Sequence, residues 1–179
     1  MEWTLMFIFD LETDGLLKDM STIHCLVIHD TEAKETYTYS ETGPNEPIVR
    51  GVQVLQDAPC IAGHNIIGFD IPAIRQIYPW ADFNNDVVDT LLLSRLLHPN
   101  LLEVDKKRQW KHMPLQLYGR HSLEAYGHRL GEYKGEFAKH TDWKDWSPEM
   151  ERYCQQDVKV TTKLCHHLAQ KLSVYAETN

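Results

Sequence analysis

Two acidic side chains close an apolar segment near the N-terminus. Residues 5–12 read LMFIFDLE, a pattern typical of a strand that is buried on both faces. Because residues i and i+2 of a strand project from the same face, Asp10 and Glu12 are expected to lie side by side. Adjacent carboxylates repel one another unless a cation lies between them, so this pair is a candidate metal site. The alternative is a pair of solvated charges at the end of a strand.

Two further acids end the segments HNIIGFD (64–70) and YCQQD (153–157). Asp70 is the last residue of HNIIGFD, a segment that joins a short apolar strand to a helix. Ligands of parallel sheets bind beyond the carboxyl ends of such strands. Asp157 ends the second on a long predicted helix, where a spacing of four residues places it on one face with Tyr153. Taken one at a time, Asp70 could cap its helix, and Tyr153 could be a core residue beside an exposed Asp157.

The elements that must position these residues are predicted from hydrophobic patterning. We expect strands at 5–12, 22–30, 35–40, 60–63 and around Val87 and Val88, and helices at 47–56, 70–78, 90–98, 122–130 and from Ser147 through Asp157 towards Leu172. Residues 100–119 are predicted to be irregular and basic. Three consecutive strands followed by alternating strands and helices predict an α/β fold, in which helices flank both faces of a mixed sheet.

Length and composition fit one globular domain over residues 1–179. The chain has a mass of 20.9 kDa and is 42% hydrophobic, a balance that argues against intrinsic disorder. No apolar run approaches the ~20 residues that span a bilayer, and no signal peptide is recognisable, so we expect a cytoplasmic protein without a membrane partner. The four cysteines form no CxxC pair, which argues against a zinc knuckle and favours a reducing compartment.

The formal net charge of −8 argues against a nucleic-acid partner, but the charges are unevenly spread. Residues 1–105 carry five basic and 17 acidic side chains, whereas residues 106–179 carry 13 basic and nine acidic ones. This asymmetry favours an anionic partner near the second half. The tract KKRQWKH (106–112) could follow a phosphate backbone while Trp110 stacks on a base, or it could be a solvated loop.

Taken together, the acidic segments resemble a known family. FDLETDG (9–15), HNIIGFD and YCQQD occur in the order and local pattern of the DEDD exonucleases. The residue five before the last acid is Arg152 rather than histidine, so the chain resembles the tyrosine subclass. The segments 89–101 and 120–137, and the Trp-rich stretch after them, resemble the N-terminal proofreading domain of podophage family-A DNA polymerases. The likeness covers nearly the whole chain.

This resemblance implies a ribonuclease H-like fold and hydrolysis of the terminal phosphodiester at a 3′ end, with release of nucleoside 5′-monophosphates. Two divalent cations, Mg²⁺ with Mn²⁺ as an expected substitute, would be held by Asp10, Glu12, Asp70 and Asp157. Asp10 would bridge both cations, Glu12 and Asp157 would complete the nucleophile side, and Asp70 would act on the leaving-group side. Tyr153 would orient the attacking water, because a free phenol has a pKa of about 10 and is a poor base at neutral pH.

The same resemblance implies contacts with the substrate strand at Thr13, Leu16, Asn65 and Phe69. Leu16 would act as a wedge against the terminal base, whereas Phe69 could equally be a core aromatic. The expected partners are the 3′ end of single-stranded DNA and, as an open possibility, a polymerase domain or subunit.

Two other functions compete with a DNA exonuclease. One is a 3′→5′ exoribonuclease similar to ribonuclease D, although nothing in the chain resembles the additional helical RNA-binding domain of those proteins. The other is a non-catalytic nucleic-acid-binding or polymerase-assembly module. Such a module would have no need of a mutually repelling cluster of four acids, which favours an enzyme.

Overall fold

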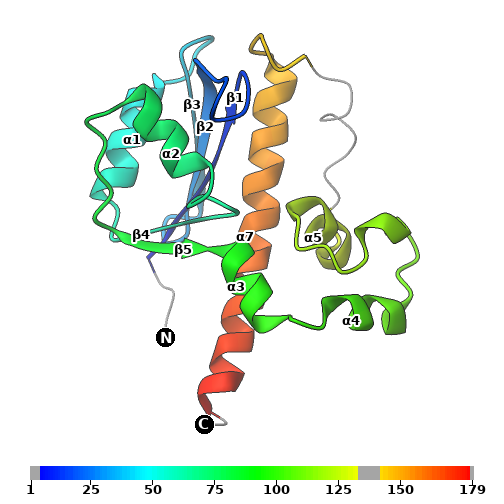
Figure 1. The fold of residues 1–179 in the computed structure, drawn as a ribbon. Helices are drawn as coiled ribbons and strands as arrows, with labels where there is room; N and C mark the ends of the chain where they lie inside the picture. The colour runs from blue at the N-terminus through cyan, green and yellow to red at the C-terminus, as the bar shows by residue number, and fades with distance from the viewer. Residues whose placement is uncertain (1–4, 133–141, 178–179) are drawn as a thin grey trace.

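A five-stranded mixed sheet forms the centre of the computed structural model, which describes residues 5–132 and 142–177 (Figure 1). The strands lie in the order β3-β2-β1-β4-β5. The first three strands pair antiparallel, whereas β4 pairs parallel to β1 and β5 pairs parallel to β4. Their bounds are β1 Phe7–Thr13, β2 Ile23–Asp30, β3 Glu35–Ser40, β4 Cys60–Gly63 and β5 Asp86–Asp89. The predicted three-strand meander followed by parallel strands is therefore confirmed.

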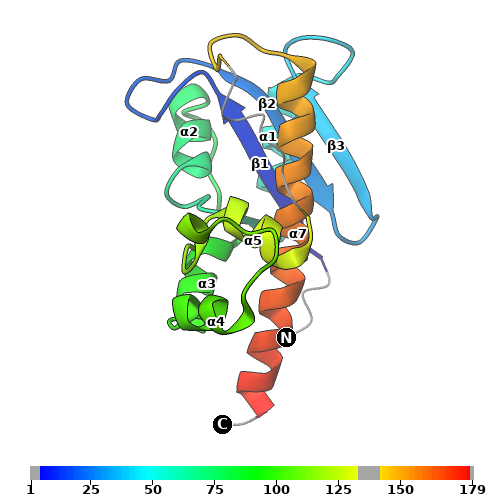
Figure 2. The ribbon, with the colours of Figure 1, turned by 90° about the vertical axis from the view of Figure 1, so that its right-hand side faces the viewer.

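Helices cover both faces of this sheet (Figures 1 and 2). The helices α1 (Ile48–Asp57) and α2 (Asp70–Ile77) lie on one face, and the long helix α7 (Pro148–Glu177) crosses the other. Two shorter helices, α3 (Thr90–Leu97) and α5 (Leu123–Leu130), pack against α7. The flanked α/β architecture is the predicted one.

Alternation along β1 divides its side chains between two apolar layers. Phe9 and Leu11 belong to the buried cluster beneath α1 and α2, whereas Ile8 belongs to the cluster that includes α7. The period of two therefore turns Asp10 and Glu12 towards α7. The sheet thus places the two N-terminal acids opposite the helix that carries Asp157.

Most predicted boundaries agree with the structure to within two residues. Ser147 caps α7 as expected, because its hydroxyl accepts a hydrogen bond from the Met150 N–H at 3.2 Å. The helix continues as one element to Glu177, and part of the 120–137 segment lies outside the described residues. No described helix has both the length and the apolar composition needed to cross a bilayer.

The prediction that residues 100–119 are irregular is wrong. The helix α4 spans Leu101–Arg108, and a 3₁₀ turn spans Leu115–Leu117. Only Leu101 and Asp105 of α4 are buried, so the helix shows no apolar stripe that patterning could detect. Instead, Asp105 fixes it by accepting hydrogen bonds from the side chain of Arg129 and the backbone N–H of Gly119.

Candidate active site

Helix α7 brings a thiol against the paired acids of β1. Single ligand atoms of Asp10, Glu12 and Cys154 all lie within 4.8 Å of one another. The Cys154 thiol donates to the backbone oxygen of Asp10 at 3.3 Å and lies 3.6 Å from its Oδ2 atom. Tyr153 immediately precedes this cysteine, and Asp157 follows it by one turn of the helix.

Asp70 reaches the same end of the sheet from the first residue of α2. Its side chain is only 3% exposed, and its carboxylate accepts a hydrogen bond from the backbone of Leu11, between the two acids of β1. Burial raises the pKa of Asp70 to about 7, and repulsion from Asp89 and Asp157 acts in the same direction. Asp70 and Asp157 are therefore close enough to repel one another, and the Leu11 contact places Asp70 beside the paired acids of β1.

The donor set of this site suits divalent cations. Asp70 and Asp157 are buried at 3% and 6% exposure, and such carboxylates repel unless a proton or a cation compensates them. Carboxylate oxygens are the ligands that Mg²⁺ and Mn²⁺ prefer. Burial, the neighbouring Cys25 thiol and the charges of Asp10 and Glu12 raise the pKa of Cys154. Sulfur is also a soft ligand, whereas Mg²⁺ prefers carboxylate oxygens. The four acids, rather than the cysteine, fit a metal centre.

A pocket of about 360 Å³ opens beside Glu12. Three of the four predicted substrate residues line it, namely Thr13, Leu16 and Phe69. Leu16 is 66% exposed at this pocket, whereas the buried Thr13 hydroxyl donates to the Gly15 carbonyl at 2.7 Å and so shapes the turn. Trp143 also lines the pocket; apart from its place in a Trp-rich stretch, nothing in the sequence marks it.

The fourth predicted substrate residue, Asn65, lies in a separate cleft of about 520 Å³. Asn65 adopts a left-handed backbone conformation with φ of 67°, and a Cβ atom on Gly68 would lie 2.6 Å from its Oδ1 atom. A side chain at position 68 would therefore displace the Asn65 amide. The cleft also contains cationic and imidazole side chains from both of its walls, namely His64, Arg95, Arg120 and His121.

Asp89 holds the loop that carries Asn65, a role that sequence reasoning missed. Its carboxylate accepts hydrogen bonds from the N–H groups of Asn65 at 3.0 Å and Ile67 at 3.1 Å. It also caps α3 by accepting from the Leu91 N–H at 2.9 Å. An aspartate directly before the helical segment TLLLSRLL is a cap signal, but the bonds to the distant loop carry no local sequence signature.

Trp110 of the basic tract is engaged inside the protein rather than presented to a ligand. Its indole N–H donates to Asp105 at 2.9 Å, and the Arg108 guanidinium lies 4.2 Å from its ring centroid. The ring also packs against a buried cluster that includes Met113 and Leu117. Of the two alternatives that the sequence left open, a base-stacking platform and a solvated loop, the structure shows neither: 106–108 form the last turn of α4, and Trp110 packs against the protein.

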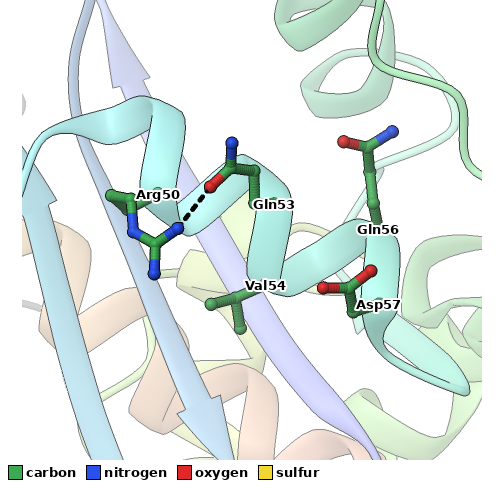
Figure 3. Close-up of a pocket in the computed structure, with 5 residues that line it drawn as sticks. All are labelled: Arg50, Gln53, Val54, Gln56 and Asp57. Atoms are coloured by element: carbon green, nitrogen blue, oxygen red, sulfur yellow. Dashed lines mark hydrogen bonds between the residues drawn. The ribbon is translucent and has the colours of Figure 1, made fainter.

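The pocket drawn in Figure 3 is unrelated to the acidic site. It is a hollow of about 270 Å³ whose lining residues, Arg50 to Asp57, all belong to α1. Arg50 donates to the side-chain oxygen of Gln53 at 2.6 Å across it. None of the predicted site residues lines this hollow.

Comparison with known proteins agrees with the fold. A family model described as the RNase H superfamily matches residues 7–169, and the chain belongs to this superfamily. The chain is 31% identical over 186 residues to the DNA-directed DNA polymerase of Escherichia phage T7. That alignment covers 91% of this chain and 26% of the polymerase, so the chain spans about a quarter of that relative. The resemblance to phage DNA polymerases predicted from the sequence is confirmed.

Two solved structures share the fold at low sequence identity. Escherichia coli RNase D, described as an exoribonuclease involved in structured RNA processing, superposes with a TM-score of 0.62 at 13% identity, covering 94% of this chain and 40% of RNase D. Brucella melitensis NrnC with bound Mg²⁺ superposes with a TM-score of 0.58 at 18% identity, covering 97% of this chain and 76% of NrnC.

Proposed function

We propose that this protein is a metal-dependent 3′→5′ exonuclease that removes nucleoside 5′-monophosphates from single-stranded DNA ends. The observation that carries the proposal is the convergence of Asp10, Glu12, Asp70 and Asp157 at the end of the sheet where the pocket beside Glu12 opens. Asp70 and Asp157 are buried and Asp10 and Glu12 are half-buried, so this cluster of acids is costly to maintain without cations. It also lies where a strand end could enter.

The four acids would hold two divalent cations in this site. When bound, such cations lower the pKa of a water molecule and stabilise the charge that develops on the attacking and leaving oxygens. Tyr153 would hold the attacking water through its hydroxyl, one helical turn from Asp157. Trp143 meets the Tyr153 ring edge-on at 6.1 Å and so restrains the orientation of the phenol.

The cleft that contains Asn65 gives the strand a path away from the site. Arg95 and Arg120 are exposed there, and guanidinium groups bind phosphate oxygens strongly. We expect the phosphates behind the terminal nucleotide to run along this cleft. The acidic net charge of the chain is thus compatible with a nucleic-acid substrate, because the contact surface is locally basic.

DNA is the substrate we favour, because the relative with 31% identity is a DNA polymerase. That relative is a phage DNA polymerase, which supports a role in proofreading beside a polymerase domain or subunit, in the host cytoplasm. RNase D shares the fold, so RNA is the alternative that the experiment must address.

The decisive experiment is release of mononucleotides from 3′-end-labelled DNA and RNA strands of one sequence. We expect release from DNA in Mg²⁺ or Mn²⁺, none in EDTA, and none from the Asp10→Ala and Asp157→Ala variants. If the protein cleaves the RNA strand in preference to the DNA strand, it is an exoribonuclease instead. Binding of the strand without cleavage under any of these conditions would favour the non-catalytic module.

A further inference from the structure

The pairing of β1 with β2 is irregular at the end of the sheet that carries the acidic site. Glu12 pairs with Cys25, whereas the next residue of β1, Thr13, pairs with Ile23. His24 is therefore an extra residue on β2 that the register passes over. An extra residue of this kind forms a β-bulge, which re-aims the side chains of the strand that carries it.

The bulge exchanges the faces of two neighbouring residues. Further along β2, Leu26 packs in the cluster beneath α1 and α2, and Cys25 packs in the cluster that includes α7. Regular alternation would place His24 on the side of Leu26 and Ile23 on the side of Cys25. Instead, Ile23 packs beneath α1 and α2, and the Nε2 atom of His24 lies 2.9 Å from the carbonyl oxygen of Trp143. The Trp143 indole packs against the α7 cluster, so the bulge turns the imidazole towards α7.

The hydrogen bond of His24 anchors the segment that leads into α7. A carbonyl oxygen can only accept a hydrogen bond, so the Nε2 atom of His24 carries the proton and donates it. The side chain of His24 is only 8% exposed, and the bond joins residues 119 positions apart in the chain. Removing the donor would leave the Trp143 carbonyl without this partner in surroundings that are shielded from water.

Trp143 extends this anchor to Tyr153. The two rings meet edge-on, with their centroids 6.1 Å apart and an interplanar angle of 71°. Such a contact favours one orientation of the phenol over others. Tyr153 directly precedes Cys154, whose thiol lies 3.6 Å from the Oδ2 atom of Asp10. The phenol therefore belongs to the turn of α7 that faces the acidic site.

We infer that His24 is a positioning residue of the exonuclease, which acts on the attacking water through Trp143 and Tyr153. The imidazole fixes the backbone of Trp143, the indole restrains the phenol, and the phenol holds the water. This inference rests on the proposed function, because that function assigns the water to Tyr153. A small misplacement of a group that orients a nucleophile is costly to the chemical step. His24 should therefore affect kcat much more than KM.

The first test compares His24→Leu with His24→Gln. Leucine removes the donor, whereas the amide nitrogen of glutamine can take the place of Nε2 and donate to the same carbonyl. We expect His24→Leu to lower kcat by about tenfold or more with KM changed by less than about twofold, and His24→Gln to recover most of kcat. Equal losses of kcat in the two variants, or a loss that appears only in KM, would overturn the inference.

A double-mutant cycle with Tyr153→Phe separates positioning from a general loss of structure. If His24 acts through the phenol hydroxyl, His24→Leu should cost little once that hydroxyl is absent. A loss of kcat that persists undiminished in the Tyr153→Phe background would make His24 a structural residue only, against the inference. His29→Leu is the matched control and should keep the wild-type kcat, because His29 lies on the same strand and its Nδ1 atom is bonded to Thr36 at 3.0 Å instead.

A spectroscopic measurement separates this inference from the proposed activity. In protein made with fluorotyrosine, the fluorine resonance that disappears in Tyr153→Phe reports the surroundings of the Tyr153 ring. His24→Leu should shift or broaden this resonance, whereas His24→Gln should leave it close to its wild-type position. That result in a protein that releases no mononucleotides would support the positioning of Tyr153 by His24 while rejecting the exonuclease. A resonance unchanged by His24→Leu would overturn the inference even if the exonuclease is active.

Discussion

The side chains of Asp105 and Arg129 form a buried, bidentate ion pair between α4 and α5. Nε of Arg129 lies 3.1 Å from Oδ1, and Nη2 lies 2.6 Å from Oδ2. The aspartate side chain is fully buried and that of the arginine is 7% exposed. Burial opposes ionisation, but hydrogen bonds from Arg129, Gly119 and Trp110 outweigh it and lower the pKa of Asp105. The buried carboxylate of Asp105 thus holds residues 101–119 in place, the segment that sequence patterning predicted to be irregular.

Removing this carboxylate should strongly destabilise the protein. We expect Asp105→Asn to lower the free energy of unfolding by about 3–5 kcal/mol, because the substitution leaves the Arg129 charge buried without its counterion. Urea denaturation followed by circular dichroism measures the change. Asp82→Asn is the control, since Asp82 pairs with Arg75 at 3.8 Å on the exposed surface and should cost less than about 1 kcal/mol. Equal losses in the two variants would contradict the role assigned to Asp105.

Cys154 should be dispensable for metal binding, although it lies among the acids. The Cys154→Ala variant is expected to keep its Mg²⁺-dependent activity within about threefold, because Mg²⁺ prefers hard oxygen ligands to sulfur. The Asp10→Asn variant should lose at least about 100-fold. Initial rates at saturating Mg²⁺ make the comparison. A loss in Cys154→Ala as large as that in Asp10→Asn would identify the cysteine as part of the metal centre.

Divalent cations should raise the melting temperature. Ions that bind only the folded protein stabilise it by ~2.7 kcal/mol at one hundred times Kd, which corresponds to roughly 5–10 °C for a chain of this size. Thermal melts in EDTA, Mg²⁺ and Mn²⁺ at matched ionic strength measure the shift. In Asp157→Asn the melt in EDTA should occur at or above the wild-type temperature, because repulsion with Asp70 is relieved. The same variant should respond less to Mn²⁺, and an undiminished response would argue against the acidic site.

The sheet and the order of the acids were predictable because both depend on local patterns. The period of two along β1 identified a strand with Asp10 and Glu12 on one face, and Asp70 and Asp157 followed recognisable helix signals. What the sequence could not supply is the contact between segments far apart in the chain. The hydrogen bonds of Asp89 to the 65–67 loop join residues more than 20 positions apart and leave no periodic trace.

The tryptophans illustrate the same limit. Trp110 stands in a basic tract and suggested a stacking platform, yet its ring is held by Arg108 and Asp105. Trp143 carried no comparable signal, yet it lines the pocket beside Glu12. Whether an aromatic ring faces a core or a ligand depends on its neighbours in space. Composition and spacing could not distinguish the two cases.

Arg95 and Arg120 should contribute to strand binding through phosphate contacts. Replacing either by alanine is expected to raise KM with little change in kcat, and to reduce the slope of log binding constant against log salt by about 0.7 for each lost contact. Arg50→Ala is the matched control, because Arg50 is exposed on α1, outside this cleft (Figure 3). Fluorescence anisotropy of a labelled single strand over a range of salt concentrations gives the slopes. Identical slopes for the three variants and the wild type would exclude the cleft as the strand path.

Mild acid should weaken the fold through His98. Burial lowers the pKa of His98 to about 4, and the nearby His167, Lys171, His121 and Arg129 act in the same direction. Its ring stacks on that of His167 at 5.5 Å, and its buried Nε2 atom has no hydrogen-bond partner among the described residues. Protonation of His98 is therefore easier in the unfolded chain, whose imidazole pKa is about 6.5.

The sign of the pH dependence follows from this difference. Between pH 6.5 and 4 the imidazole of His98 binds a proton in the unfolded chain but not in the folded protein. The contribution of neutral His98 to the free energy of unfolding is therefore complete above pH 6.5 and is lost as the pH falls towards 4. Because the ring is partly exposed, we expect a loss of about 1 kcal/mol between pH 7.5 and 5. Urea denaturation at the two pH values measures it. The His98→Phe variant keeps an aromatic ring that can stack on His167 but cannot bind a proton. Its free energy of unfolding should therefore fall by about 1 kcal/mol less than that of the wild type over the same pH range. An equal fall in both proteins would mean that other groups cause the acid sensitivity.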